Sequence, residues 1–201
     1  IASSDFREPP EAIHLPYELL DSSGIKHKTV KSPSPNFDAV FHLFGEQKMP
    51  SVLGIKQFKS KMHIYINSKK YPATIMKKFI GSAQFKELSV NPIDPKNVEL
   101  EILKTISELP MANHIGFNLT GGTKLMFAGA MAASNKVNGV PFYFETKNHN
   151  LIYLTDFTFA QAKRIDNVET FIRVNTNNFS ISNKGFWEDL PGRNSPERAD
   201  L

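Results

Sequence analysis

The sequence predicts an α/β fold, with a mainly parallel sheet, helices on both of its faces and a C-terminal β-hairpin. Apolar runs of strand length alternate with segments whose apolar residues recur at helical spacing. Loop residues, mostly Gly, Asn, Pro and Lys, separate these segments. Strands that alternate with helices favour a parallel sheet joined by right-handed crossovers.

The composition narrows the range of functions. The chain has 201 residues, enough for one α/β domain with appended segments or for two small domains. Its net charge of +4 and its pI near 9.2 suit an anionic ligand. Because the chain contains no cysteine, disulfides, cysteine nucleophiles and cysteine-ligated zinc are excluded. No apolar run reaches the roughly 18 residues of a transmembrane helix, so we expect a cytoplasmic domain.

The first expected strand, residues 38–44, is an apolar run that ends at Gly45. Pro50 favours a helix start because its missing N–H would be unpaired there, and the apolar residues of 52–58 then follow at helical spacing. The preceding residues 1–37 are dense in proline and serine, which break regular elements. We therefore expect that segment to be a linker or an arm.

The next two strands are expected at residues 62–66 and 85–90, where apolar runs lead into polar loops. Between them, the apolar residues of 75–83 recur at helical spacing. Asp94 suits the N-cap of a helix over residues 95–109, because its side chain accepts N–H bonds and the proline after it favours the first helical position.

A fourth strand, residues 114–119, leads into Gly121 and Gly122 and then into a helix over 124–134 that is rich in small residues. A strand, a glycine turn and a helix bring free N–H groups and the positive end of a helix dipole to one point. That point suits an anion, above all a phosphate. The ordinary alternative is a helix cap beside a solvent-facing lysine.

Residues 140–145 and 151–154 are expected to pair as a hairpin, because polar turn residues separate them. The patterns that follow are irregular. We expect a C-terminal packing segment at 156–188 and a flexible tail at 189–201. Within the packing segment, the apolar pattern of 168–174 leaves helix and strand both open.

Ligands bind parallel sheets beyond the carboxyl ends of the strands. Four of the expected loops meet at that edge, namely residues 45–50, 67–70, 91–94 and 120–124. Together they offer ammonium, amide and hydroxyl groups to an anion. The side chains concerned are Gln47, Lys48, Asn67, Ser68, Lys69, Lys70, Thr120, Thr123 and Lys124.

Other kinds of site match the sequence less well. Gly45 stands alone after its strand, so the Gly-x-Gly-x-x-Gly of a dinucleotide site is absent, and the later glycine pair lacks the spacing of a nucleoside-triphosphate loop. The histidines form no helical pair four residues apart, so we expect no metal site. Glu145-Thr146-Lys147, with Asp94 as a second carboxylate, remains a loose match to a restriction-type nuclease site.

Two motifs carry a family resemblance. Residues Asn118–Met126 resemble the signature of CRISPR-associated Rossmann fold (CARF) domains, above all those of the Card and Can effectors. Residues His42–Leu53 resemble the opening strand and first ligand loop of the same group, and Asn67–Lys69 stands at its second-strand loop. The resemblance covers residues 38–155 and implies a Rossmann-like ligand-binding domain.

What the resemblance implies is a sensor for a cyclic oligoadenylate, first of all cyclic tetra-adenylate, bound on the two-fold axis of a homodimer or within a higher oligomer. This second messenger belongs to type III CRISPR antiviral defence. We expect no catalytic residue, no metal and no cofactor besides the ligand. We also expect no DNA partner, because the C-terminal segment contains no readable helix-turn-helix. The ligand-binding residues that the resemblance implies are Gly45, Glu46, Gln47, Lys48, Met49, Pro50, Asn67, Ser68, Lys69, Thr120, Gly121, Gly122, Thr123 and Lys124.

The output and the chemistry stay open. Familiar members continue into an effector domain, and nothing after residue 155 is long enough for one, so we expect the output in a segment outside this sequence. The sequence begins with Ile1 rather than Met, and a transmembrane helix before it would anchor the domain at the inner face of the cell membrane. The alternative function is a ring nuclease, in which a ribose 2′-hydroxyl attacks its own phosphate while Lys124 and Ser68 stabilise charge.

Overall fold

A computed structural model describes residues 20–21, 24–25, 35–109, 112–165 and 168–176 of the chain. Most of the expected N-terminal arm, the apolar end of the packing segment and the expected tail lie outside the described residues. Within the arm the structure describes two short strands, β1 (Leu20–Asp21) and β2 (Gly24–Ile25), which pair antiparallel, and residues 35–37, the last of which begins β3 (Phe37–Leu43).

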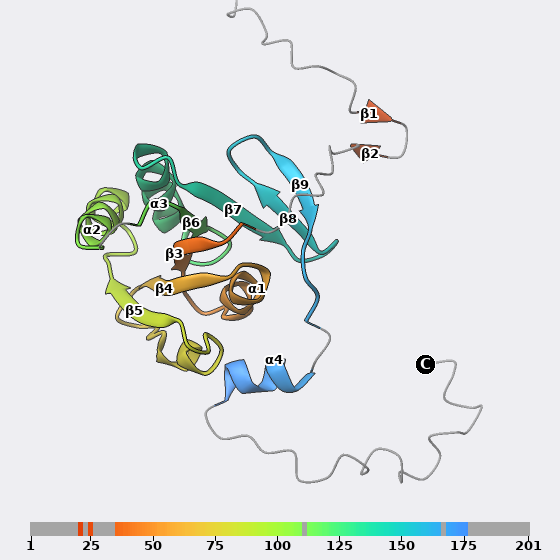
Figure 1. Cartoon of the computed structure of the whole chain (residues 1–201), viewed down its shortest axis with the longest axis horizontal. Coiled ribbons are helices and arrows are strands. Elements are labelled where there is room, and N and C mark those ends of the chain that lie inside the picture. Colours follow the sequence, from red (N-terminus) through yellow and green to blue (C-terminus); the bar gives the residue numbers. More distant parts are fainter. Residues whose placement is uncertain (1–19, 22–23, 26–34, 110–111, 166–167, 177–201) are drawn as a thin grey trace, which may run out of the picture.

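One sheet organises the domain, with the strand order β5-β4-β3-β6-β7-β8-β9 (Figure 1). Its first five strands in that order are parallel, and β8 and β9 are each antiparallel to the strand before them. The parallel strands are β3 (Phe37–Leu43), β4 (Ser60–Asn67), β5 (Gln84–Ser89), β6 (Ile115–Asn118) and β7 (Val140–Glu145), followed by β8 (Asn150–Tyr153) and β9 (Thr158–Gln161). This topology confirms the predicted Rossmann-like α/β class and its hairpin.

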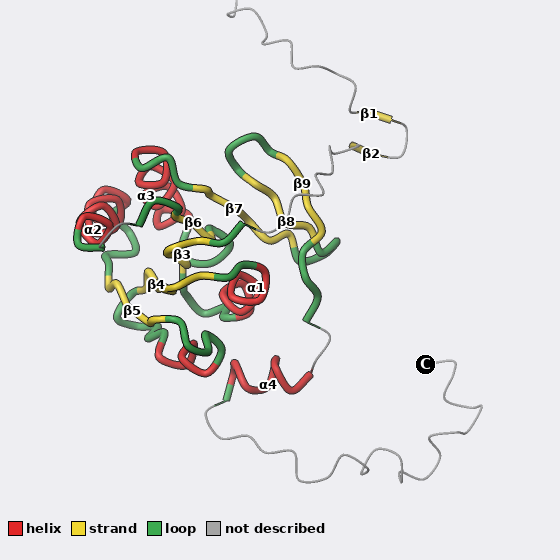
Figure 2. The backbone as a smooth tube through the Cα atoms, viewed as in Figure 1, coloured by secondary structure: helices red, strands yellow, loops and turns green. Residues whose placement is uncertain are grey.

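Helices cover both faces of the sheet, as predicted. Figure 2 shows α2 (Pro95–Ser107) and α3 (Lys124–Lys136) on one side of the strands and α1 (Met49–Gln57) on the other. Asp94 caps α2 as expected, because its carboxylate accepts hydrogen bonds from the N–H groups of Lys96 at 2.9 Å and Asn97 at 3.0 Å.

The central strand β3 is buried on both faces, which is why its sequence is almost continuously apolar. Phe41 and Leu43 point to the side of α2 and α3, where Phe41 stacks on Phe117 with ring centroids 5.2 Å apart. Val40 points to the opposite side and packs with Phe58 at the end of α1. The sheet is therefore a fixed frame for the loops at its carboxyl edge.

The structure differs from the sequence prediction at residues 75–83. A 3₁₀ helix, η1 (Thr74–Lys78), replaces the expected α-helix, and its i+3 hydrogen bond from Phe79 to Met76 ends it. Met76 is the buried residue of this turn, and Gly81 has a positive φ of 60°. Because the left-handed backbone at Gly81 cannot continue a helix, the helical segment is limited to this short turn.

Residues after 155 are more regular than the sequence indicates. β9 joins the main sheet next to β8, and this strand was not predicted. Residues 168–174, where the sequence left helix and strand open, form a helix, α4 (Val168–Asn175). Its Val174 is fully buried against Phe44 and Tyr65, so α4 packs on the domain beside the loop that follows β3.

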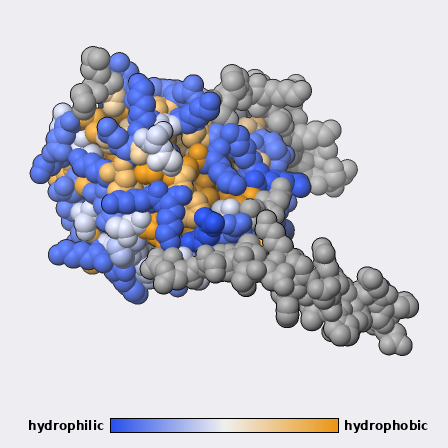
Figure 3. Space-filling model, turned by 60° about the horizontal axis from the view of Figure 1, so that its bottom comes forward, coloured by the Kyte–Doolittle hydropathy of each residue, from blue (hydrophilic) through white to orange (hydrophobic). Residues whose placement is uncertain are grey.

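The described surface mixes polar and apolar residues. On the face that Figure 3 brings forward, apolar residues show between hydrophilic ones. Large apolar side chains that are exposed include Ile93, Leu125, Phe157 and Phe171. Within the described ranges, no helix combines the length and the apolar character needed to cross a bilayer.

Candidate functional site

A cavity of about 820 Å³ lies where the parallel strands end. Its walls come from the ends of β3, β4 and β5 and from the glycine loop before α3, so the loops converge at this edge as the sequence predicts. The volume is in the range of ligand pockets. The lining residues are Phe44, Gly45, Glu46, Ser68, Lys69, Lys70, Tyr71, Ser89, Val90, Asn91, Pro92, Asn97, Gly122, Thr123 and Met126.

The glycine loop passes very close to β3, and only glycine fits there. A Cβ atom on Gly121 would overlap the carbonyl oxygen of Leu43. Gly122 has a φ of 74°, in the left-handed region that favours glycine. The loop therefore lies directly against the end of β3, and its backbone is within reach of a ligand in the cavity.

Thr123 joins the glycine loop to the loop after β5. Its hydroxyl oxygen accepts a hydrogen bond from the Met126 N–H at 3.1 Å, which makes Thr123 the N-cap of α3. The same hydroxyl donates to the carbonyl oxygen of Pro92 at 2.8 Å. One side chain thus starts the helix and fixes two walls of the cavity relative to each other.

Asn118, at the end of β6, fixes the other side of the glycine loop. Its Oδ1 accepts hydrogen bonds from the Thr120 N–H at 3.2 Å and the Thr120 hydroxyl at 2.8 Å. Its Nδ2 donates to the carbonyl oxygen of Pro50 at 2.8 Å. The Thr120 hydroxyl also accepts from the Phe144 N–H at 2.9 Å. Thr120 and Pro50 therefore take part in the frame behind the cavity.

The cavity carries more positive than negative charge. Lys69 and Lys70 line it, and Glu46 is the acidic residue among its described lining residues. The Lys70 ammonium lies 5.1 Å from the centre of the Tyr71 ring, and a hydrogen bond with Tyr71 raises the pKa of Lys70. Lys70 is therefore a permanent cation at neutral pH, which suits an anionic ligand.

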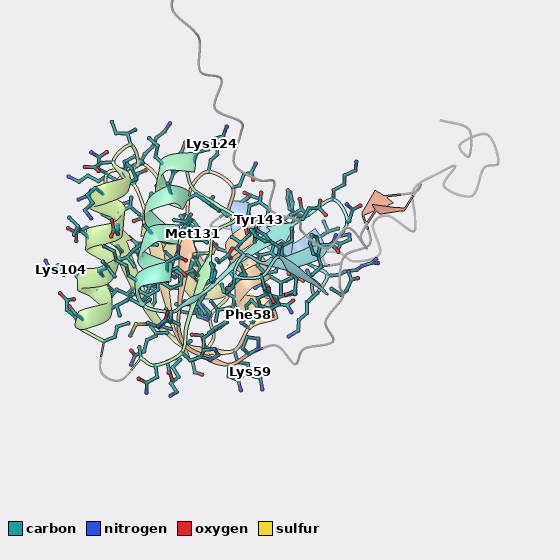
Figure 4. The ribbon with its side chains drawn as sticks, turned by 90° about the horizontal axis from the view of Figure 1, so that it is seen from above. Phe58, Lys59, Lys104, Lys124, Met131 and Tyr143 are labelled. Atoms are coloured by element: carbon teal, nitrogen blue, oxygen red, sulfur yellow. The ribbon has the colours of Figure 1, made fainter. Side chains whose placement is uncertain are left out.

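Two further lysines lie at this edge without lining the cavity. Lys48 lines a smaller neighbouring cavity of about 310 Å³, together with Lys70, Tyr71 and Asn175 of α4. Lys124 is the first residue of α3 and is exposed. Figure 4 shows Lys124 at the end of the molecule opposite Lys59, which follows α1.

The predicted site residues therefore fall into two groups. Gly45, Glu46, Ser68, Lys69, Gly122 and Thr123 line the main cavity. The remaining eight lie in the same loops but outside its lining, namely Gln47, Lys48, Met49, Pro50, Asn67, Thr120, Gly121 and Lys124. Among these, Asn67 is buried and donates from Nδ2 to the Tyr71 carbonyl oxygen at 3.0 Å, which holds the loop after β4.

Several lining residues were not among the predicted ligand contacts. Tyr71, Asn91 and Asn97 are the clearest, and Asn97 reaches the cavity from the first turn of α2. The Asn97 side-chain oxygen accepts a hydrogen bond from the backbone N–H of Asn91 at 2.9 Å, so the first turn of α2 is joined to the loop after β5. The signal for Asn91 was its place in a loop at the carboxyl edge, whereas nothing in the sequence distinguishes Asn97 from an ordinary exposed helix residue.

The described residues provide no evident metal centre. No group of three or more His, Cys, Asp or Glu side chains is placed to hold a metal ion in the part of the chain that the structure describes. The Glu145 carboxylate accepts hydrogen bonds from the N–H groups of Lys147 at 2.7 Å and Asn148 at 3.0 Å. These bonds stabilise the turn between β7 and β8, which is an ordinary structural role for Glu145.

A family model described as the Card1 CARF domain matches residues 40–177, well over half of the chain. The chain belongs to this CARF family. The match begins in β3 and ends after α4, so the CARF domain includes all seven strands of the main sheet. No curated protein matches the sequence.

Solved structures share the fold of this CARF domain. Can2 from Sulfobacillus thermosulfidooxidans, in complex with cyclic tetra-adenylate, has a TM-score of 0.57 at 17% identity over 68% of the chain. Protein VC1899 from Vibrio cholerae has a TM-score of 0.56 at 12% identity over 68% of the chain. A type III CRISPR defence DNA nuclease activated by cyclic oligoadenylate has a TM-score of 0.55 at 14% identity over 78% of the chain. The matched region spans 40%, 38% and 26% of those three proteins, respectively.

Proposed function

We propose that this CARF domain is a sensor that binds a cyclic oligoadenylate, with cyclic tetra-adenylate as the first choice, in type III CRISPR signalling. The observation that carries the proposal is the cavity at the carboxyl edge, with its lysines and its helix N-terminus. Each phosphate that links two adenosines carries one negative charge. The complex of Can2 with cyclic tetra-adenylate supports the choice of ligand, because Can2 shares the fold.

The lining residues suggest a division of roles. Lys69 and Lys70 attract the phosphates, and the Ser68 hydroxyl donates to a phosphate or ribose oxygen. The backbone at Gly122 and Thr123, at the positive end of α3, receives a second phosphate. The apolar part of the cavity is left for an adenine base.

Some predicted residues lie outside the cavity lining, and these suit the part of the cyclic oligoadenylate that would extend beyond the cavity. Gln47 and Lys48 lie in the loop after β3, and Lys124 lies at the start of α3. All three belong to the same edge of the sheet as the cavity. We propose that they contact the ligand from the rim.

A second copy of the chain completes the site in this proposal. Ile93 is 73% exposed and follows Pro92, and Leu125 is 44% exposed and lies two residues after Thr123, while Pro92 and Thr123 both line the cavity. Exposed apolar residues at a ligand edge favour burial against a partner. A two-fold axis through this edge would present the same loops to both halves of a ring with even symmetry. The signal then passes to an effector segment outside this sequence.

Calorimetry with cyclic tri-, tetra- and hexa-adenylate tests the proposal directly. We expect heat with cyclic tetra-adenylate at a ratio of one ring per two chains. Absence of heat with all three rings would contradict the sensor. Prolonged incubation followed by chromatography separates the alternatives, because intact ligand indicates a sensor and linear product indicates a ring nuclease.

A further inference from the structure

A second cavity, of about 740 Å³, lies at the opposite edge of the sheet, where β4 and β5 begin. It is bounded by the end of α1, the segment before β5 and Lys163, which follows β9. Figure 4 shows Phe58 and Lys59, which line it, far from Lys124 at the ligand edge. Nothing in the proposed function uses this cavity.

The walls of this amino-edge cavity combine cations with apolar side chains. Ile55, Phe58 and Phe79 provide apolar surface. Four lysines line it, and no described acidic residue does. They are Lys56, Lys59, Lys61 and Lys163.

Two of the four lysines already have partners. The Lys61 ammonium pairs with the Asp38 carboxylate at 2.8 Å. The Lys163 ammonium donates to the carbonyl oxygens of Lys56 at 2.9 Å and Gln57 at 3.3 Å, at the C-terminal end of α1. Lys56 and Lys59 are exposed and form no ion pair with any described residue, so both are available to an anion in the cavity.

His63 also lines the cavity and is only 2% exposed. The hydrogen bonds behind it fix its tautomer. Asn118 Nδ2 is a donor, because Oδ1 of the same amide accepts from Thr120, so His42 Nδ1, at 3.3 Å, accepts. A neutral His42 therefore carries its proton on Nε2 and donates it to His63 Nδ1 at 2.9 Å.

This chain of hydrogen bonds leaves the His63 proton on Nε2. That N–H has no partner among the described residues, in a side chain that is almost completely buried. His63 Nε2 is not among the fully buried side-chain atoms that lack a partner, so this N–H is open to the cavity, where an acceptor group of a ligand can bind it. Because Nε2–H can only donate, the matching ligand group is an acceptor.

We propose that the amino-edge cavity binds a small organic phosphate, whose phosphate accepts from His63 Nε2–H and is neutralised by Lys56 and Lys59. The body of the ligand then lies against Phe58 and Phe79. A cavity of about 740 Å³ is large enough for a molecule of nucleotide size. The proposal does not depend on binding of a cyclic oligoadenylate at the other edge.

Nuclear magnetic resonance of protein labelled with ¹⁵N in its histidines tests the proposal. We expect the Nε2–H tautomer for both His42 and His63 at neutral pH. Inorganic phosphate should shift the His63 ring signals, adenosine 5′-monophosphate should do so at lower concentration, and adenosine should not. In the double variant Lys56→Gln/Lys59→Gln, the concentration of monophosphate needed should rise by about tenfold.

Lys104→Gln is the matched control, because Lys104 is an exposed lysine on α2, away from both cavities. It should leave the shift unchanged. The proposal is overturned if neither phosphate moves the His63 signals, if adenosine moves them equally, or if the double variant behaves like Lys104→Gln. A proton on His63 Nδ1 would also overturn it. Lys56 and Lys59 do not line the main cavity, so the double variant should not weaken phosphate binding there. A weaker response in the double variant therefore reports on the amino-edge cavity.

Discussion

The Thr123 hydroxyl donates a 2.8 Å hydrogen bond to the carbonyl oxygen of Pro92. This bond joins the loop after β5 to the loop after β6, which are not adjacent strands in the sheet. The same hydroxyl caps α3 through the Met126 N–H. The shape of the main cavity and the start of α3 therefore depend on one side chain.

Replacing that hydroxyl should affect both properties. Thr123→Val keeps the shape of the side chain but removes the cap, so we expect the free energy of unfolding to fall by about 1 kcal/mol in urea titrations. Cyclic tetra-adenylate should also bind more weakly, because the two loops are no longer joined. Thr123→Ser keeps the hydroxyl and should resemble the wild type in both measurements. Equal stability of the valine and serine variants would show that the cap contributes nothing.

The lysines of the cavity should govern affinity through charge. We expect Lys69→Gln and Lys70→Gln each to weaken binding of cyclic tetra-adenylate by about tenfold in calorimetry. Added salt should weaken wild-type binding more than variant binding, because salt screens exposed charges. Lys104→Gln makes the same change of charge on the outer surface of α2 and should have no effect. If all three variants lose the same affinity, the overall net charge is responsible and the local site is not.

Glu46 should oppose the same ligand. It is the acidic residue in the described lining of the cavity, and its carboxylate repels a phosphate. We expect Glu46→Gln to strengthen binding of cyclic tetra-adenylate, with the gain decreasing as salt is added. Glu108→Gln, at the end of α2, is an exposed control that should leave affinity unchanged. Weaker binding by Glu46→Gln would instead indicate that the carboxylate accepts a hydrogen bond from the ligand.

The sequence predicted the order of the fold well, because each parallel strand is a buried apolar run with a clear stop. Asp94 and Pro95 marked the start of α2 correctly, since N-cap chemistry is local. The 3₁₀ turn at Thr74–Lys78 was not predictable, because apolar spacing alone does not separate one short turn from a longer helix. β9 was missed because Thr158–Gln161 has only four residues, too few for an apolar alternation to stand out.

The sequence predicted the location of the candidate site better than it predicted which side chains line it. Parallel strands bring their following loops to one edge, so the positions of Ser68, Lys69 and Thr123 follow from topology. Which way each side chain points does not follow from topology. The Thr120 hydroxyl bonds to Asn118 and Phe144 behind the cavity, which only the packed structure reveals. Asn97 reaches the cavity because α2 begins directly at its rim.

The close approach of the glycine loop to β3 should make Gly121 hard to replace. In Gly121→Ala the new Cβ would overlap the Leu43 carbonyl oxygen, a backbone atom that cannot move without disturbing β3. We expect the free energy of unfolding to fall by about 3 kcal/mol in urea titrations. Gly81→Ala is the control, because its Cβ meets nothing within 4 Å and only its φ of +60° is unfavourable, at about 1 kcal/mol. Equal losses for both variants would contradict the close packing of the loop on β3.

The buried histidine pair should make stability depend on pH. Burial lowers the pKa of His63 from 6.5 to about 4 and holds the pKa of His42 well below its ordinary value. In the unfolded chain both rings take up protons as the pH falls through about 6.5, whereas in the folded protein they stay neutral. The stability that depends on these neutral rings is therefore fully present above about pH 6.5. The free energy of unfolding falls as the pH drops toward about 4, and His63 accounts for about 3 kcal/mol of this loss.

Urea titrations between about pH 7 and about pH 4.5 should show this loss in the wild type. His63→Gln should make this loss of stability smaller, because only one buried histidine with a lowered pKa then remains. His149→Asn changes an exposed histidine whose φ of 55° asparagine tolerates, and its stability should depend on pH as that of the wild type does.

The ring signals of His63 provide a measurement that needs no variant, since they should stay those of a neutral imidazole down to about pH 5. A ring that protonates near 6.5 in the folded protein would mean that the His42–His63 pair is open to water.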